Sequence, residues 1–274
     1  MPRASLQKIR EIWKGFTRTS AGVHASSIAF FFFLSVIPLV IIYAWIVASA
    51  GQSQEAVNAF FVHIVPAPLE DFVGSVVDEA YEKSGIAFSV SLLTLLWTAS
   101  RGARVLRGGL NAVYEIEETR NRAIVTAISI VATIILIALL SAAVYLIFNV
   151  SIRNAFAQVV PGVSVPNELE RLFNGMLMLV FGTVVFAGCY TYLPAGKRTF
   201  AKQLPGAACA AIAWSILSFG FQIYVDHFSN YTLLYGSLAT VALFLFWLYL
   251  VFYILLAGGF INCCLAHTDE AERE

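Results

Sequence analysis

Charged side chains are scarce in this sequence, and neither sign predominates. Only 12% of its 274 residues are charged, whereas roughly 25% is usual for a globular domain. The formal net charge is zero, so no overall basicity points to nucleic acid as a partner. Hydrophobic residues make up 59% of the chain. Because one soluble core cannot bury so much apolar surface, the composition indicates a membrane protein.

Residue patterns typical of catalysis are also missing. The histidines are scattered, there is no glycine-rich phosphate loop or GxSxG motif, and the apolar segments hold no paired carboxylates. The cysteines lie in or beside apolar runs without the spacing of a metal site. These residues are His24, His63, His227 and His267, and Cys189, Cys209, Cys263 and Cys264. We therefore expect reduced thiols, no metal, no cofactor and no enzymatic reaction.

Long apolar runs, by contrast, are abundant. No charged residue lies between Ala123 and Asn149, and about 20 such residues in a helix already cross the hydrocarbon core of a bilayer. Pro38 should kink the first apolar helix, because proline removes a backbone donor. The same criterion predicts six membrane spans, at 22–50, 84–100, 123–149, 173–193, 204–225 and 236–266.

The first span has an alternative interpretation as a cleaved signal peptide. Residues 1–20 are basic, and Ala48-Ser49-Ala50 resembles a cleavage site. The apolar stretch from Ala25 to Val47 is longer than the roughly 7–15 residues of a signal peptide. That length favours an uncleaved helix.

The basic residues predict the orientation of the chain in the membrane. Of the 17 Lys and Arg residues, only Lys83, Arg153 and Arg171 fall in connections on one side of the six spans. The remainder lie on the other side, which by the positive-inside rule is the cytoplasm. We expect an all-α polytopic membrane protein with both termini in the cytoplasm. Its parts are a basic segment 1–21, one transmembrane domain 22–266 and a tail 267–274.

Two segments outside the spans have helical patterns. Apolar residues recur at helical spacing in 52–83, on either side of Pro66-Ala67-Pro68, with acidic residues on the other faces. This pattern predicts an outer amphipathic helical segment, with a re-entrant hairpin as the alternative. Residues 101–118 are expected to continue the second span into the cytoplasm as a polar helix.

Within these helices, two sets of ionisable residues are candidate sites. Arg101, Arg104 and Arg107 recur every three residues, so they share one helix face. They are interpreted either as a positive-inside anchor or as a cradle for the phosphate groups of anionic lipid. Asp226 and His227, at the outer end of the fifth span, are interpreted either as a helix end at the membrane surface or as an outer gate.

Small residues cluster in the last two spans. Gly206 and Ala210 have the small-xxx-small spacing that lets helices approach closely, and Gly258 with Gly259 should serve the same end. Packing is the main interpretation, and a pore-lining face is the alternative. The positions assigned to packing or kinks are Pro38, Gly206, Ala210, Gly236, Gly258 and Gly259.

Several stretches together resemble a known family. The main one runs from Tyr235-Gly236-Ser237 through Trp247-Leu248-Tyr249 to Gly258-Gly259-Phe260-Ile261-Asn262, with supporting matches at Ala25–Phe30 and Leu96–Ser100. This pattern resembles the last helix of the YihY/BrkB family of bacterial inner-membrane proteins. The family usually has an acidic residue where this chain has Phe260, which puts any ion-coupling role in doubt.

The resemblance implies a multi-pass protein of the bacterial inner membrane without defining an activity. Some members have carried a ribonuclease label, but this sequence has neither the metal ligands nor the basic face that RNA hydrolysis requires. Transport of lipid or small solutes is the role most often proposed for such proteins.

Three functions are therefore open. The first is a transporter-like bundle acting on a lipid or another amphiphile of the envelope, whose tails stay in the bilayer while the headgroup follows a polar path. The second is an ion or small-solute channel or exchanger gated at Asp226 and His227, and the third is a scaffold that binds envelope proteins through 52–83. The expected headgroup path comprises Arg101, Arg104, Arg107, Ser26, Ser27, Tyr190, Tyr235, Ser237 and Asn262.

Overall fold

The computed structural model describes most of the apolar helices and two of the connections between them. It describes residues 14–49, 74–75, 77–78, 85–121, 123–132, 134–135, 138, 167–227 and 237–271. All regular structure in these ranges is helical. The five long helices are α2 (Ala21–Ser49), α5 (Gly85–Val113), α8 (Asn167–Tyr192), α9 (Phe200–His227) and α11 (Ser237–Ala271). The all-α class is confirmed.

Four helical segments are long and apolar enough to cross a membrane. They match the first, fourth, fifth and sixth expected spans, and they are Ala21–Ile42, Gly175–Tyr192, Phe200–Tyr224 and Val241–Thr268. The second expected span lies in α5, whose apolar half is followed directly by arginines, and it is not among the four. Of the third span, a helix over Ala123–Ala132 is described. The six-span count stays a prediction.

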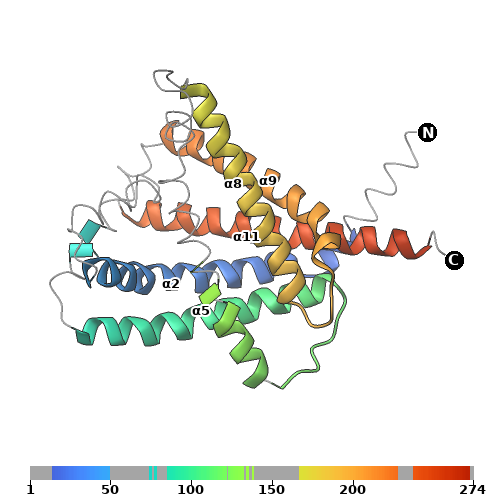
Figure 1. Ribbon diagram of the computed structural model, residues 1–274, viewed down its shortest axis with the longest axis horizontal. Helices are drawn as coiled ribbons and strands as arrows, with labels where there is room; N and C mark the ends of the chain where they lie inside the picture. Colours follow the sequence, from blue (N-terminus) through green and yellow to red (C-terminus); the bar gives the residue numbers. More distant parts are fainter. Residues whose placement is uncertain are drawn as a thin grey trace, which may run out of the picture.

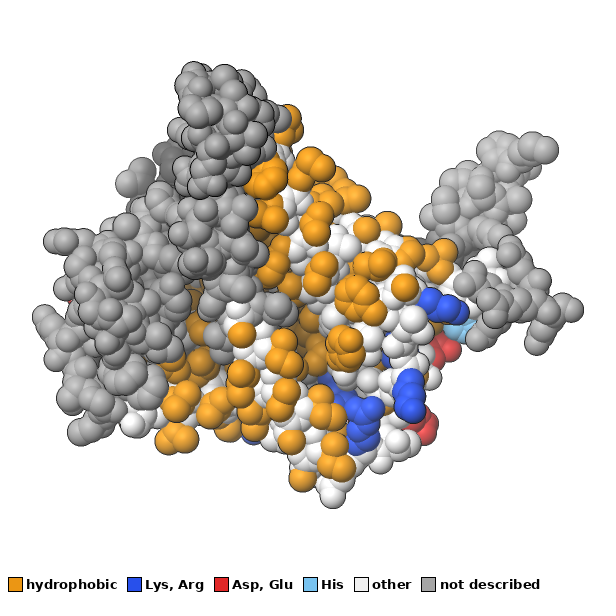
Figure 2. Space-filling model, viewed as in Figure 1, with side chains coloured by type: hydrophobic (Ala, Val, Ile, Leu, Met, Phe, Trp, Pro, Cys, Tyr) orange, Lys and Arg blue, Asp and Glu red, His pale blue; other side chains and the backbone are white. Residues whose placement is uncertain are grey.

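The surface of these helices has the character expected against lipid. Large apolar side chains point outward along α8 and α9, where Met176 is 70% exposed and Ile216 and Phe219 are each 67% exposed. Hydrophobic side chains cover much of the visible described face, and Lys and Arg gather near one end of it (Figure 2). Soluble monomers rarely expose contiguous apolar surface of this kind.

Helix α11 is the centre of the bundle. It packs against α2, α5 and α9, while α2 also packs along α5 and α8 packs on α9 (Figure 1). The fully buried side chains at these contacts come from separate helices and include Ile28, Leu110, Tyr190, Ala211 and Leu256. The apolar runs therefore form one bundle around the last helix.

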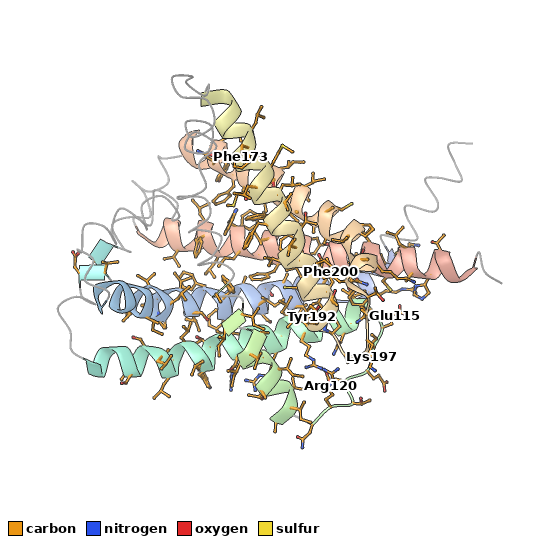
Figure 3. All side chains as sticks on the ribbon, in the orientation of Figure 1. Glu115, Arg120, Phe173, Tyr192, Lys197 and Phe200 are labelled. Carbon is orange, nitrogen blue, oxygen red and sulfur yellow. The ribbon has the colours of Figure 1, made fainter. Side chains whose placement is uncertain are left out.

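One end of the bundle collects the basic residues. Helices α5, α8 and α11 end there, and α2 and α9 begin there (Figure 1). The connections 114–121 and 193–199 lie at this end, with Glu115, Arg120 and Lys197 on them (Figure 3). We call it the basic end. Its exposed or half-buried cations are Lys14, Arg18, Arg120, Lys197, Arg198 and Lys202.

The polar helix expected over 101–118 is shorter than predicted, because α5 ends at Val113. The Ile116 N–H donates to the Asn111 carbonyl at 2.9 Å, and Glu115 has a φ of 55°. This is the Schellman arrangement that closes a helix with one left-handed residue. Glutamate occupies the position where glycine is usual, and the chain then turns back as an extended connection.

The closest helix contact joins α9 to α11 at two glycines. A Cβ added to Gly258 would lie 2.7 Å from both the Gly206 carbonyl oxygen and the Ala210 Cβ. A Cβ on Gly206 would meet the Gly258 carbonyl oxygen and lie 2.6 Å from Asn262 Cγ. Because the backbones touch here, neither helix has room for a side chain at these two positions.

Candidate functional site

An ion pair between a buried arginine and a solvent-reached glutamate lies at the basic end, where α5 meets the connection 114–121. Arg107, on α5, is 1% exposed, and its Nε lies 2.6 Å from Oε2 of Glu118. Asn111, one turn later, donates from Nδ2 to the same oxygen at 3.1 Å, and its Oδ1 accepts the Ala195 N–H at 2.8 Å. Arg107 and Asn111 together thus tie α5 to both connections of the basic end.

The Arg107 guanidinium is only partly satisfied by this pair. Its Nε–H does not point along the line to the carboxylate, so the contact is an ion pair without an aligned hydrogen bond. Its Nη1 and Nη2 are buried and have no hydrogen-bond partner among the described residues. A buried polar group without a partner costs roughly 1–3 kcal/mol, and more when it is charged. Such a group is typical of a functional site.

The Glu118 carboxylate is held in its charged form. Burial by itself would raise its pKa, but the Arg120 backbone N–H, the Arg107 charge and the Asn111 amide together hold the pKa below its usual value. Glu118 Oε1 accepts the Arg120 N–H at 3.2 Å. The side chain is 28% exposed, so solvent reaches the outer side of the pair.

A second polar cluster lies where α9 and α11 cross. Asn262 donates from Nδ2 to the Gln203 carbonyl at 3.0 Å, and its Oδ1 accepts the Gly206 N–H at 2.8 Å. These two peptide groups flank Pro205, which lies inside α9 and provides no N–H. Asn262 therefore fastens α11 to the turn of α9 that its proline weakens.

Tyr114 joins this cluster to the end of α5. Its hydroxyl donates to Gln203 Oε1 at 2.7 Å, and the Arg198 guanidinium carbon lies 3.7 Å from the centre of its ring. Burial raises the pKa of Tyr114 to about 12. The phenol is therefore neutral at physiological pH and acts as a hydrogen-bond donor.

The three arginines of α5 have different environments. The Arg101 guanidinium carbon stacks 4.7 Å from the ring centre of Trp97, which is 54% exposed. Arg104 is half-buried and donates from Nη1 to Thr126 Oγ1 at 3.0 Å. Arg107 is buried on Glu118. The three arginine side chains thus lie at increasing depth, from Arg101 at the lipid-facing surface to Arg107 in the interior.

The other residues of the expected headgroup path do not join the arginines. Ser26 is exposed and donates to the Val23 carbonyl of its own helix at 2.9 Å, and Ser27 is half-buried. Tyr190 is fully buried and donates to the Leu255 carbonyl at 2.6 Å. Asn262 belongs to the α9–α11 cluster. These polar groups satisfy the backbone or join helices.

Several candidate positions lie outside what the structure describes. Tyr235 and Gly236 are outside the described residues, and so is nearly all of the segment 52–83. Asp226 and His227 end α9, and Ser237 begins α11, but their side chains are not described. The outer gate and the binding of envelope proteins stay predictions.

The packing positions can be placed. Pro38 is buried within α2, and Ala210 lies against Gly258. A Cβ on Gly259 would lie 3.3 Å from Leu110 and 3.6 Å from the Tyr190 ring. These small residues stand at contacts between helices.

Phe260, which departs from the family pattern, packs on a short helical stretch before α2. Its ring centre lies 5.4 Å from that of Phe16, and Phe16 lies edge-on to Tyr253 at 5.3 Å. The position is thus part of an aromatic cluster that holds the N-terminal stretch to α11. An acid there would lose this ring contact with Phe16.

Sequence reasoning missed Asn111, Tyr114, Glu118 and Gln203 as members of the site. The available signal was that Glu115, Glu117 and Glu118 follow the α5 arginines closely enough in sequence for one of them to reach back to Arg107. No group of three His, Cys, Asp or Glu side chains gathers at metal distance within the described ranges. All four cysteines are free thiols.

Apolar outer faces, four helices of spanning length and a basic end define the class, an integral membrane protein built as a helical bundle. Within that class, the chain belongs to the BrkB virulence factor family, whose sequence model matches residues 12–274.

Three relatives match this chain over most of their own lengths. A ribonuclease-like protein of Bacillus subtilis, YfkH, is 27% identical, with 94% of each chain covered. The UPF0761 membrane protein PSHAa0171 of Pseudoalteromonas translucida is 25% identical, covering 89% of this chain and 81% of that one. A UPF0761 membrane protein of Vibrio atlanticus is 24% identical, covering 97% and 84%. No solved structure matches.

Proposed function

We propose that this protein is a six-span bundle of the bacterial inner membrane that moves an anionic amphiphile, such as a lipid or lipid-linked precursor. The basic end faces the cytoplasm and receives the headgroup. The single observation that supports this function best is the buried guanidinium of Arg107, with two amino groups unpartnered at the end of an apolar bundle. Ionisable groups at such positions are expensive and mark substrate pathways.

The arrangement of the α5 arginines supports a lipid rather than a free ion. Arg101 lies on exposed Trp97 at the lipid-facing surface, Arg104 follows one turn later, and Arg107 is inside. A headgroup can pass along these three while its tails stay against the exposed apolar faces. No wide aqueous pore is then needed, because only the headgroup leaves lipid.

The ribonuclease-like name of one relative does not extend to this site. Among the described residues no group of three His, Cys, Asp or Glu side chains gathers at metal distance, and the Glu118 carboxylate is already paired with Arg107. We propose that the chain is not an enzyme. We expect the purified protein to move lipid between leaflets without hydrolysing RNA.

Lipid movement in vesicles tests the function. Purified protein is reconstituted with a fluorescent anionic phospholipid, and a membrane-impermeant quencher reports exchange between leaflets. We expect the lipid to exchange between leaflets faster with wild-type protein than in protein-free vesicles. The variant Arg101→Ala/Arg104→Ala/Arg107→Ala should exchange lipid no faster than protein-free vesicles. The exposed cations Lys197 and Lys202 supply the matched control, Lys197→Ala/Lys202→Ala, which should keep the wild-type rate. Equal rates in all four samples would contradict lipid movement.

Cysteine labelling tests the orientation separately. In a cysteine-free background, a single cysteine at Lys197 should react only with reagents that reach the cytoplasm. Labelling from the outside of intact cells would refute the six-span arrangement.

A further inference from the structure

Glu118 does not complete the coordination of Arg107. The carboxylate meets the guanidinium at Nε alone, without an aligned hydrogen bond, and Nη1 and Nη2 remain buried and unpartnered. A planar guanidinium is best satisfied by a bidentate oxyanion that takes two parallel N–H donors. Asn111 Nδ2, which contacts the same Glu118 oxygen at 3.1 Å, is a further donor at this point.

We propose that Arg107 anchors a binding site for a phosphate ester, and that Glu118 is an internal carboxylate that the ligand displaces. This inference rests on the proposed function, because it names the group by which the amphiphile is held. A phosphate ester has enough terminal oxygens to accept from the guanidinium fork and from the Asn111 amide together. The Glu118 carboxylate leaves Nη1 and Nη2 without a hydrogen-bond partner among the described residues.

The connection 114–121 is built so that Glu118 can leave. Its residues Glu115, Glu117, Thr119 and Arg120 are exposed, and the Glu118 side chain itself is 28% exposed. The carboxylate is held by one ion pair and two hydrogen bonds of 3.1 and 3.2 Å. One of these comes from the Arg120 N–H of the same connection, so it moves together with Glu118.

Electrostatics favour the exchange. Arg104 lies one helical turn before Arg107, donates to Thr126 Oγ1, and contributes a second positive charge. When Glu118 swings into water, its negative charge is solvated and a dianionic or monoanionic phosphate replaces it near two arginines. The burial of Arg107 keeps water from competing for the fork.

Charge removal at Glu118 tests the proposal directly. Dihexanoyl phosphatidic acid is titrated into protein in a maltoside detergent at constant ionic strength, and binding is measured by calorimetry. Glu118→Gln should bind phosphatidic acid about tenfold more tightly than wild type, because the ligand no longer has to displace a charged carboxylate from Arg107; tenfold corresponds to about 1.4 kcal/mol. Glu117→Gln is the matched control, because it removes the same charge from an exposed neighbour.

Two further ligands identify the group that is bound. Dihexanoylglycerol has the same tails without phosphate and should not bind more tightly to Glu118→Gln than to wild type. Inorganic phosphate should compete with phosphatidic acid: weak competition assigns the site to a lipid headgroup, and equal affinity assigns it to free phosphate. Arg107→Lys keeps the positive charge but removes the pair of parallel N–H donors. In the Glu118→Gln background it should abolish the gain in affinity for phosphatidic acid.

The proposal is overturned if Glu118→Gln binds phosphatidic acid no more tightly than Glu117→Gln. This comparison does not depend on how well Arg107 variants fold. Its outcome is also separate from transport. If the protein binds phosphatidic acid tightly but does not move lipid, the proposed function is refuted and the binding site stands. If the protein moves lipid at the same rate with and without the Glu118 charge, the proposed function stands and the displacement of Glu118 is refuted.

Discussion

The crossing of α9 and α11 makes a quantitative prediction for Gly206→Ala. The added Cβ would meet the Gly258 carbonyl oxygen and lie 2.6 Å from Asn262 Cγ and Oδ1. Because a backbone group stands in its way, the helices must separate rather than one side chain turn aside. The separation also weakens the two hydrogen bonds that Asn262 makes to α9.

The magnitude follows from three contributions. Overpacking costs up to about 3 kcal/mol, and two hydrogen bonds between membrane helices are worth about 0.6 kcal/mol each. Replacing glycine by alanine in a helix returns about 1 kcal/mol. We therefore expect Gly206→Ala to lower the free energy of unfolding by about 3 kcal/mol, or roughly a hundredfold in the equilibrium constant.

Unfolding by sodium dodecyl sulfate in mixed micelles measures this change, with the fluorescence of the five tryptophans as the signal. Gly220→Ala is the matched control, because it lies on the same helix and its Cβ would meet nothing within 4 Å. That variant should be as stable as wild type or slightly more stable. The reasoning is refuted if the two variants unfold at the same detergent concentration.

Three other changes test neighbouring contacts by the same unfolding assay. Tyr190→Phe removes the buried hydroxyl that donates to the Leu255 carbonyl at 2.6 Å, and should cost about 1–2 kcal/mol; no loss would mean that the carbonyl finds another donor. Glu115→Gly relieves a φ of 55° and should stabilise by about 1 kcal/mol, whereas destabilisation would show that the Glu115 side chain has a role. Tyr114, with a pKa raised by burial to about 12, stays neutral in the folded state after it ionises in the unfolded state near pH 10. Its contribution to stability is complete below pH 10 and should disappear between about pH 10 and 12, and this loss should be absent in Tyr114→Phe.

The positions of the helices could be read from the sequence to within a few residues. Segments expected at 204–225 and 236–266 are found in Phe200–His227 and Ser237–Ala271. This works because the thickness of the hydrocarbon core sets the length of an apolar run, and that length is a local property. The small residues around Gly206 also predicted a close approach of helices, because glycine and alanine side chains do not hold neighbouring backbones apart.

The end of α5 could not be predicted in the same way. Residues 114–118 are compatible with a helix by composition, and the left-handed turn falls on a glutamate rather than on a glycine. The Tyr114 N–H still donates to the Leu110 carbonyl at 2.9 Å, as in a helix, while its hydroxyl donates to Gln203, 89 residues away. The helix therefore stops beside a tertiary contact that no local pattern encodes.

The sequence alone determined that this chain is a helical membrane protein with basic residues gathered at one end, because hydropathy and charge act on each segment separately. It placed Arg101, Arg104 and Arg107 on one face but treated them alike. Only the packing of α5 against the connections 114–121 and 193–199 buried Arg107 and left Arg101 at the surface. The same holds for Asn262, whose partners lie 56 and 59 residues away. Contacts of that range depend on how the helices cross, and no local pattern encodes the crossing.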